Sequence, residues 1–66
     1  MNIELLTTKT LQLFHEQIKI ALRADDHNPS PEKDYGVRTY PDWRSFNQRI
    51  EKELDKRKVN FDPNII

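Results

Sequence analysis

The fold depends on nine residues near the middle of the chain, which read Arg38-Thr39-Tyr40-Pro41-Asp42-Trp43-Arg44-Ser45-Phe46. Proline suits the first turn of a helix because its fixed φ is already helical, and an early acid complements the positive end of the helix dipole. We therefore expect a helix to begin at Pro41 or Asp42. Trp43, the only Trp of the chain, lies in this stretch beside Tyr and Arg, and these residue types most often anchor protein interfaces.

The residues after this start have the pattern of a helix with one apolar side, from residue 41 to about residue 57. Large apolar residues recur at steps of three and four, which places them on one stripe: Trp43, Phe46, Ile50 and Leu54. The other side is charged, and Glu53 and Arg57 form a favourable pair four residues apart. Residues 58–66 follow as a tail.

Before the nine-residue stretch, a second helical pattern runs from about residue 8 to residue 24. One stripe of this helix holds Leu11, Phe14, Ile18 and Leu22. A second apolar set, which includes Leu13 and Ile20, lies on the opposite side. A helix that is apolar on two sides is usually covered on two sides. Either another protein chain covers Leu13 and Ile20, or the N-terminal arm and the C-terminal tail fold back over them.

A connector of residues 25–40 joins the two helices. Asp25 and Asp26 oppose the dipole at the end of the first helix, and the prolines at positions 29 and 31 forbid its continuation. We therefore expect the helix to fray near Ala24 and a solvated loop to follow. Gly36, the only glycine, indicates a turn. Residues 35–39 alternate like an extended segment, which either packs on the helices or pairs with another extended piece, for which residues 58–61 are the best internal candidate.

These patterns predict an all-α fold with a single domain over residues 1–66, an antiparallel two-helix hairpin with an extended loop and tails. The predicted core contains the two facing stripes: Leu11, Phe14, Ile18, Leu22, Trp43, Phe46, Ile50 and Leu54. Two helices bury little apolar surface on their own, and a chain of 66 residues without cysteine has no disulfide to stabilise it. We expect dimerisation to complete a helical bundle.

No residue pattern indicates catalysis or metal binding. His15 and Glu16 resemble the first half of a zinc-protease helix motif, but Lys19 stands where that motif requires its second His. The consecutive residues 25–27 (Asp-Asp-His) rarely aim at one point, as metal ligands must. We therefore predict no enzymatic activity, no cofactor and no metal site.

The charge balance bears on the choice of partner. Eleven basic and eleven acidic residues give a formal net charge of zero, whereas nucleic-acid-binding proteins normally carry a basic excess. Nucleic acid is thus an unfavoured partner, and the alternative function is a small nucleic-acid-binding accessory protein that uses the basic side of the second helix. Apolar runs are too short for a membrane span or a signal peptide, so we expect no membrane association and a cytoplasmic location.

Two apolar sets and a cluster of interface-prone residue types exceed what one small core needs. We therefore predict a small non-enzymatic protein-interaction module that forms a homodimer or binds an unidentified protein partner. Its predicted interaction surface consists of Leu13, Ile20, Arg38, Tyr40 and Arg44.

Three short segments carry a resemblance. They are Tyr35-Gly36-Val37-Arg38, Tyr40-Pro41-Asp42-Trp43-Arg44 and Glu53-Leu54-Asp55-Lys56-Arg57. Together they resemble small uncharacterised bacterial proteins. The resemblance implies a bacterial cytosolic setting, but it implies no activity and assigns no functional residue.

Overall fold

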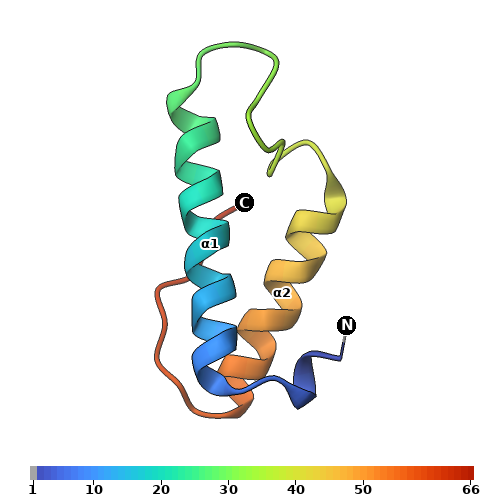
Figure 1. Cartoon of the computed structure of the whole chain (residues 1–66), viewed down its shortest axis with the longest axis vertical. Helices are drawn as coiled ribbons and strands as arrows, with labels where there is room; N and C mark the ends of the chain where they lie inside the picture. The colour runs from blue at the N-terminus through green and yellow to red at the C-terminus, as the bar shows by residue number, and fades with distance from the viewer. Residues whose placement is uncertain (1) are drawn as a thin grey trace.

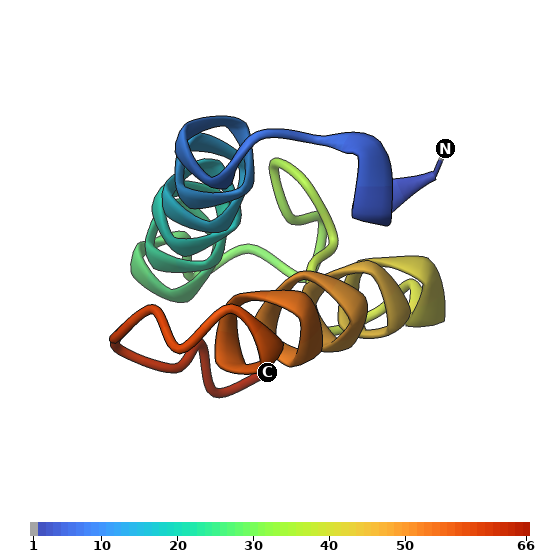
Figure 2. The same cartoon turned by 90° about the horizontal axis from the view of Figure 1, so that it is seen from below.

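The computed structural model describes residues 2–66, which form a hairpin of two antiparallel helices (Figure 1). A short 3-10 turn, η1 (Ile3–Leu5), precedes α1 (Thr8–His27), and a loop leads to α2 (Pro41–Lys56). Residues 57–66, here called the tail, double back from the end of α2 on the side away from η1 (Figure 2). No strand occurs in residues 2–66, and the predicted all-helical hairpin is confirmed.

Both helices begin at residues whose chemistry favours a helix start. The Thr7 side chain accepts a hydrogen bond from the backbone N–H of Thr10 at 3.1 Å, so it caps one of the unpaired donors of the first turn of α1. Pro41 occupies the first turn of α2, where the missing N–H has no intrahelical partner to lose, and Asp42 follows it. These starts agree with the local preferences of the sequence.

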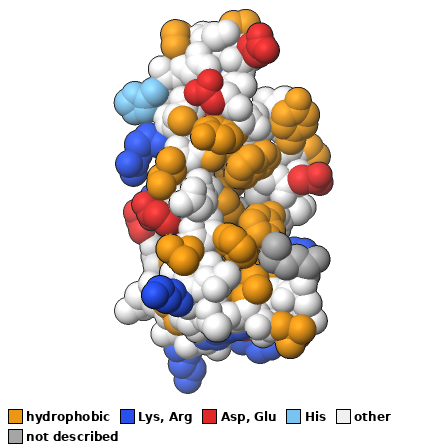
Figure 3. Space-filling model, viewed as in Figure 1, with side chains coloured by type: hydrophobic (Ala, Val, Ile, Leu, Met, Phe, Trp, Pro, Cys, Tyr) orange, Lys and Arg blue, Asp and Glu red, His pale blue; other side chains and the backbone are white. Residues whose placement is uncertain are grey.

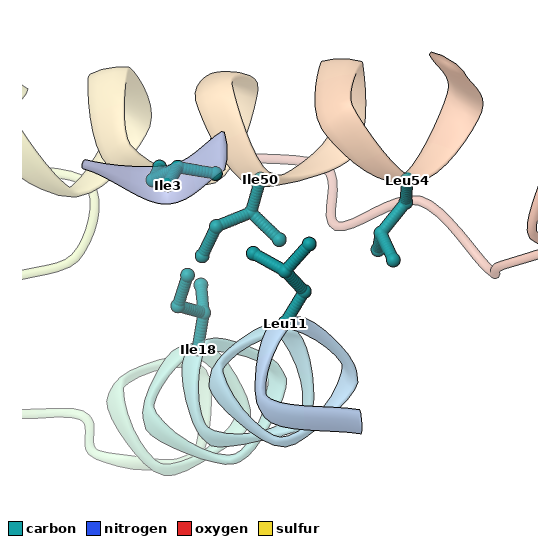
Figure 4. Packing of buried hydrophobic residues seen from close by; sticks show 5 residues of the cluster. All are labelled: Ile3, Leu11, Ile18, Ile50 and Leu54. Atoms are coloured by element: carbon teal, nitrogen blue, oxygen red, sulfur yellow. The ribbon is translucent and has the colours of Figure 1, made fainter. Parts of the chain in front are cut away.

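The centre of the molecule is a cluster of five aliphatic side chains from three elements (Figure 4). This main cluster consists of Ile3, Leu11, Ile18, Ile50 and Leu54, all almost completely buried. Burial of each such side chain contributes about 1.5–3 kcal/mol, so the cluster is a large source of hydrophobic stabilisation. Nearer the loop, a smaller cluster joins Ala21 and Leu22 to Val37.

The predicted core residues fall into two groups. The structure buries Leu11, Ile18, Leu22, Ile50 and Leu54. The three aromatic residues, Phe14, Trp43 and Phe46, pack against the main cluster but are only partly buried. Each aromatic ring therefore has one side on the core and one side toward solvent.

The tail covers one side of the hairpin and adds apolar side chains to the core there. Its apolar residues Val59, Phe61 and Ile66 pack against the main cluster. The Phe61 ring also meets the His15 ring edge-on, with 5.4 Å between the ring centroids. The tail thus supplies the third layer that a two-helix hairpin lacks.

Four polar side chains, here called the polar network, fix the tail to both helices: His15, Asn47, Glu51 and Asn64. His15 Nε2 lies 2.7 Å from Glu51 Oε2, and the same oxygen accepts the backbone N–H of Asn64 at 2.8 Å. The side-chain Nδ2 of Asn64 donates to the His15 carbonyl at 3.1 Å and to Asn47 Oδ1 at 2.9 Å. Because buried polar groups need partners, these bonds fix the position of the tail closely.

Helix α1 continues to His27, so the predicted fraying near Ala24 is wrong. The reason lies in Asp25, which is only 3% exposed and turns its carboxylate toward the loop. Its Oδ1 accepts the backbone N–H of Tyr35 at 2.9 Å, and its Oδ2 accepts that of Val37 at 2.8 Å. These bonds offset the unfavourable position of an acid at a helix C-terminus and hold the end of the loop, whereas residues 29–34 are exposed as expected.

Residues 35–40 form a turn whose Val37 packs against α1, so of the two expected arrangements the structure has packing on a helix and not pairing with residues 58–61. The Gly36 carbonyl accepts the backbone N–H groups of Thr39 at 3.0 Å and Tyr40 at 2.9 Å. Gly36 has a φ of +72°, and a Cβ atom there would lie 2.6 Å from the Tyr40 ring. Glycine is therefore required both for the backbone conformation and for the close approach of that ring.

Arg57 links three elements at the end of the molecule that lies away from the loop. The predicted pair with Glu53 is confirmed, with 2.8 Å between Arg57 Nε and Glu53 Oε2. The guanidinium also donates to Thr8 Oγ1 and to the Glu4 carbonyl, both at 3.2 Å. One side chain thus links the end of α2 to the beginning of α1 and to η1.

Helix α2 ends in a motif that normally contains glycine. The N–H of Val59 bonds to the Leu54 carbonyl and that of Lys58 to the Asp55 carbonyl, both at 2.9 Å, which is the Schellman pattern. The residue at the left-handed position is Lys58, with a φ of +60°. A residue with a Cβ atom is strained in this conformation.

Replacement of Lys58 by glycine is expected to raise the free energy of unfolding by about 0.5–1 kcal/mol, because relief of the left-handed strain exceeds the added entropy of the unfolded chain. Urea denaturation followed by circular dichroism measures the change. Asn60→Gly is the matched control, since it adds the same entropy at an exposed tail residue without positive φ. Equal destabilisation by both variants would contradict the expectation.

Candidate interaction surface

Leu13 and Ile20 remain uncovered in the folded chain. Their exposed fractions are 54% and 46%, although the tail does fold back on the hairpin. The tail packs on the main cluster instead, and the Leu5 side chain in η1 is itself exposed. The alternative in which the chain's own arm and tail cover Leu13 and Ile20 is therefore wrong.

These two residues belong to a larger apolar surface where α1 and α2 meet. Figure 3 shows hydrophobic side chains gathered over both helices on the face seen in Figure 1. We call this surface the apolar face and define it as Leu13, Phe14, Gln17, Ile20, Tyr35, Trp43 and Phe46. Leu13 adjoins the others on α1 because it lies four residues before Gln17 and seven before Ile20.

An open groove of about 180 Å³ runs through the apolar face. Its walls are Phe14, Gln17 and Ile20 on one side and Tyr35, Trp43 and Phe46 on the other, with Ile18 and Ala21 also lining it. None of the described residues that line the groove is charged. A second, shallower hollow of about 320 Å³ continues over Trp43 and Phe46 to Asp42, which marks the edge of the face.

The aromatic rings of the face hold one another in place. Phe14 and Phe46 lie 6.0 Å apart between ring centroids at an interplanar angle of 51°, across the two helices. Tyr35 and Trp43 are 6.2 Å apart at 75°, an edge-to-face contact between the loop and α2. Such pairs gain energy beyond their buried area and restrict ring motion. The four aromatic rings of the face are thus each in contact with another ring before a partner binds.

The remaining predicted interaction residues gather at the loop end, apart from the groove. Arg38, Tyr40 and Arg44 line a small cavity of about 90 Å³ with their neighbours in the chain. Arg38 has a structural role, because its guanidinium makes two bonds to the Asp26 carboxylate, at 3.0 and 3.1 Å. Asp25 and Asp26 thus bind different groups, and their carboxylates do not point toward one common position as the ligands of a metal ion do.

Tyr40 and Arg44 complete the predicted set. The Tyr40 side chain is largely exposed, but one edge of its ring covers Gly36. Arg44 is exposed on the first turns of α2. The structure brings these residues together with Arg38, yet it places Leu13 and Ile20 on a separate part of the surface.

The basic side of α2 is less basic than its sequence indicates. A hollow of about 380 Å³ brings Arg49, Lys52 and Lys56 together with the acids Glu4 and Glu53. Arg57 is bonded to Glu53 and faces η1. The positive charges of this side are therefore interspersed with carboxylates.

Sequence reasoning missed the exposed sides of Phe14, Trp43 and Phe46, and it missed Tyr35 and Gln17 altogether. A signal for Gln17 was present in the spacing, since Thr10, Leu13, Gln17, Ile20 and Ala24 alternate in steps of three and four. That spacing is typical of a seam between packed helices. The exposure of the aromatic residues has no comparable signal, because they share a stripe with fully buried residues.

No helix in residues 2–66 is long and apolar enough to cross a membrane. No protein-family model matches the chain, and neither a curated protein nor a solved structure matches it.

Proposed function

We propose that the chain is a small non-enzymatic protein-interaction module that binds another protein surface through its apolar face. The observation that carries the proposal is the open, uncharged groove between α1 and α2, flanked by half-exposed aromatic rings. Contiguous exposed apolar surface on a small protein is typical of a binding site. Phe, Tyr and Trp are also enriched in the cores of interfaces.

The aromatic rings of the apolar face and the mixed charges elsewhere on the surface favour a protein as the partner. Its rings are held by neighbours on the core side, so little side-chain entropy is lost when a partner covers them. A nucleic acid would need a strong positive field, and the mixed charges around Arg49, Lys52 and Lys56 do not favour the alternative of an accessory nucleic-acid-binding protein. The bacterial cytosolic setting implied by the sequence resemblance is part of the same proposal.

Site-specific photo-crosslinking tests the proposal in cells that produce the protein. A photoreactive residue at position 20 replaces Ile20, which lines the groove and is half exposed, so a bound protein lies within its reach. Position 48 provides the control, because Gln48 is exposed on another side of α2. We expect discrete protein adducts from position 20 that position 48 does not give. Equal or absent adducts at both positions would refute the proposed binding face.

A further inference from the structure

We infer that the partner on the apolar face is a second copy of the chain, related by a two-fold axis that passes beside Gln17 of α1. The inference rests on the proposed function, since it names the occupant of the same face. The dimer would contain α1 and α2 of each copy, four helices in all, with the two tails on the outside. A two-fold contact uses the same residues of both copies, so the face must be complementary to itself.

The accessible surface area of the chain agrees with burial of the apolar face by a second copy. Its accessible surface is 4992 Å², whereas a compact monomer of this mass is expected to expose roughly 4,400 Å². The molecule is correspondingly elongated, with extents of 38, 21 and 15 Å. The excess of roughly 600 Å² approaches the ~800 Å² per partner that a standard interface buries. A single copy thus has surface left over that a second copy can bury.

The charges of the face favour a copy over a charged partner. A residue that lies on a two-fold axis meets its own counterpart, so a charged residue there would repel itself. The groove is lined by no charged side chain, and the formal net charge of the whole chain is zero. Two copies can therefore approach without net repulsion, while a strongly charged partner finds no complementary surface on this face.

Gln17 gives the most specific argument for two-fold symmetry. It is the polar member of the seam on α1, between Leu13 and Ile20, and it is exposed in the single chain. An amide carries both a donor and an acceptor, so two amides across a two-fold axis can exchange hydrogen bonds in both directions. Leu13 of one copy then lies near Ile20 of the other, because the two positions are almost equally far from Gln17. A single polar residue in such a seam fixes the register of the paired helices.

The first experiment measures molar mass by light scattering on a sizing column at tens of micromolar protein. We expect twice the monomer mass of 7.9 kDa for the unchanged chain. Gln17→Glu places two carboxylates against each other at the axis and is expected to weaken the dimer by about tenfold or more. Gln17→Leu keeps the seam apolar and is expected to keep the dimer. Gln12→Glu is the control, because it adds the same charge to an exposed position on another side of α1.

The outcomes separate the two proposals. A monomer at tens of micromolar would overturn the second-copy inference, and a dimer that resists Gln17→Glu would overturn the assigned axis. Circular dichroism of each variant confirms that the helices are kept, as expected for exposed positions. The crosslink at position 20 adds an independent readout. An adduct of dimer mass supports the inference, and adducts with other proteins alone support the proposed function but exclude the second copy.

Discussion

Asp25→Asn is expected to lower the melting temperature by about 10 °C or more, although it only replaces one carboxylate oxygen by an NH₂ group of similar size. In the native chain both carboxylate oxygens accept backbone N–H groups, Oδ1 from Tyr35 and Oδ2 from Val37. An asparagine offers one oxygen and one NH₂ group, so one of these N–H donors would face another donor in a nearly closed site. The loop would then lose its attachment to α1, and Val37 would leave the smaller core cluster.

Asp26→Asn is the matched control for this prediction. Asp26 is the next residue, it is exposed, and its carboxylate pairs with Arg38 at the surface. Exposed ion pairs contribute little, so we expect a fall of at most a few degrees. Thermal denaturation followed by circular dichroism compares the two variants directly. An equal effect of both substitutions would contradict the assignment of this stability to the hydrogen bonds that Asp25 accepts from the loop.

The same carboxylate makes stability depend on pH in the acid range. Desolvation raises the pKa of Asp25, but hydrogen bonds from Val37, Tyr35 and Gly36 and the charge of Lys33 outweigh it, so the pKa lies below its usual value of 3.8. A depressed pKa means that the folded state favours the ionised form. The contribution is thus complete above pH 3.8 and is lost as the pH falls through the folded pKa. The Arg38 hydrogen bond lowers the pKa of Asp26 in the same direction.

Urea titrations between neutral and acid pH measure this loss. The native chain is expected to lose stability steeply once the pH falls below about 4. The Asp25→Asn variant is expected to be less stable at neutral pH and to show a shallower decline. Identical slopes for both proteins would contradict the assignment of this pH dependence to Asp25.

The helices could be predicted because their signals are local. Pro41 and Asp42 mark a start whatever lies elsewhere in the chain, and the spacing of Leu11, Ile18 and Ile50 marks the buried stripes. The Glu53–Arg57 pair also acts within one turn of a helix. Such features need no knowledge of the partner element, which is why the hairpin followed from the sequence.

The end of α1 could not be predicted because it depends on residues far along the chain. Asp25 is unfavourable for the helix alone and becomes favourable only when the Tyr35 and Val37 N–H groups reach it. The polar network has the same character, since Asn64 and His15 are 49 residues apart. Residues of these types are usually exposed, so their burial shows only when the chain is folded.

The apolar face illustrates a third case. The sequence correctly marks Leu13 and Ile20 as surplus to one core, and the structure leaves them exposed. The sequence cannot show that the aromatic stripe of α2 is covered on one side only. Periodicity indicates which side of a helix faces the core, but it does not indicate how deeply each residue is buried. Trp43 and Phe46 therefore belong both to the core and to the candidate interaction surface.

Asn64→Asp is expected to lower the free energy of unfolding by about 2–4 kcal/mol at neutral pH, again without a change of shape. The His15 carbonyl can only accept, so the atom of Asn64 that faces it must be the donor Nδ2, and Asn47 must then present its oxygen. Aspartate would put a carboxylate oxygen against the His15 carbonyl, which cannot donate, at a buried site. A small domain of this size has a total stability of about 3–5 kcal/mol, so a large part of it would be lost.

Asn60→Asp is the control in the same tail, because Asn60 is exposed and the added charge stays in water. Urea denaturation followed by circular dichroism gives both free energies, and we expect a change within about 0.5 kcal/mol for the control. Amide hydrogen exchange adds a local readout, since the Asn64 N–H that bonds to Glu51 should exchange much faster in Asn64→Asp. If both variants were equally stable and kept this amide protected, the polar network would contribute nothing to holding the tail. The free energy of the third layer would then come from Val59, Phe61 and Ile66 alone.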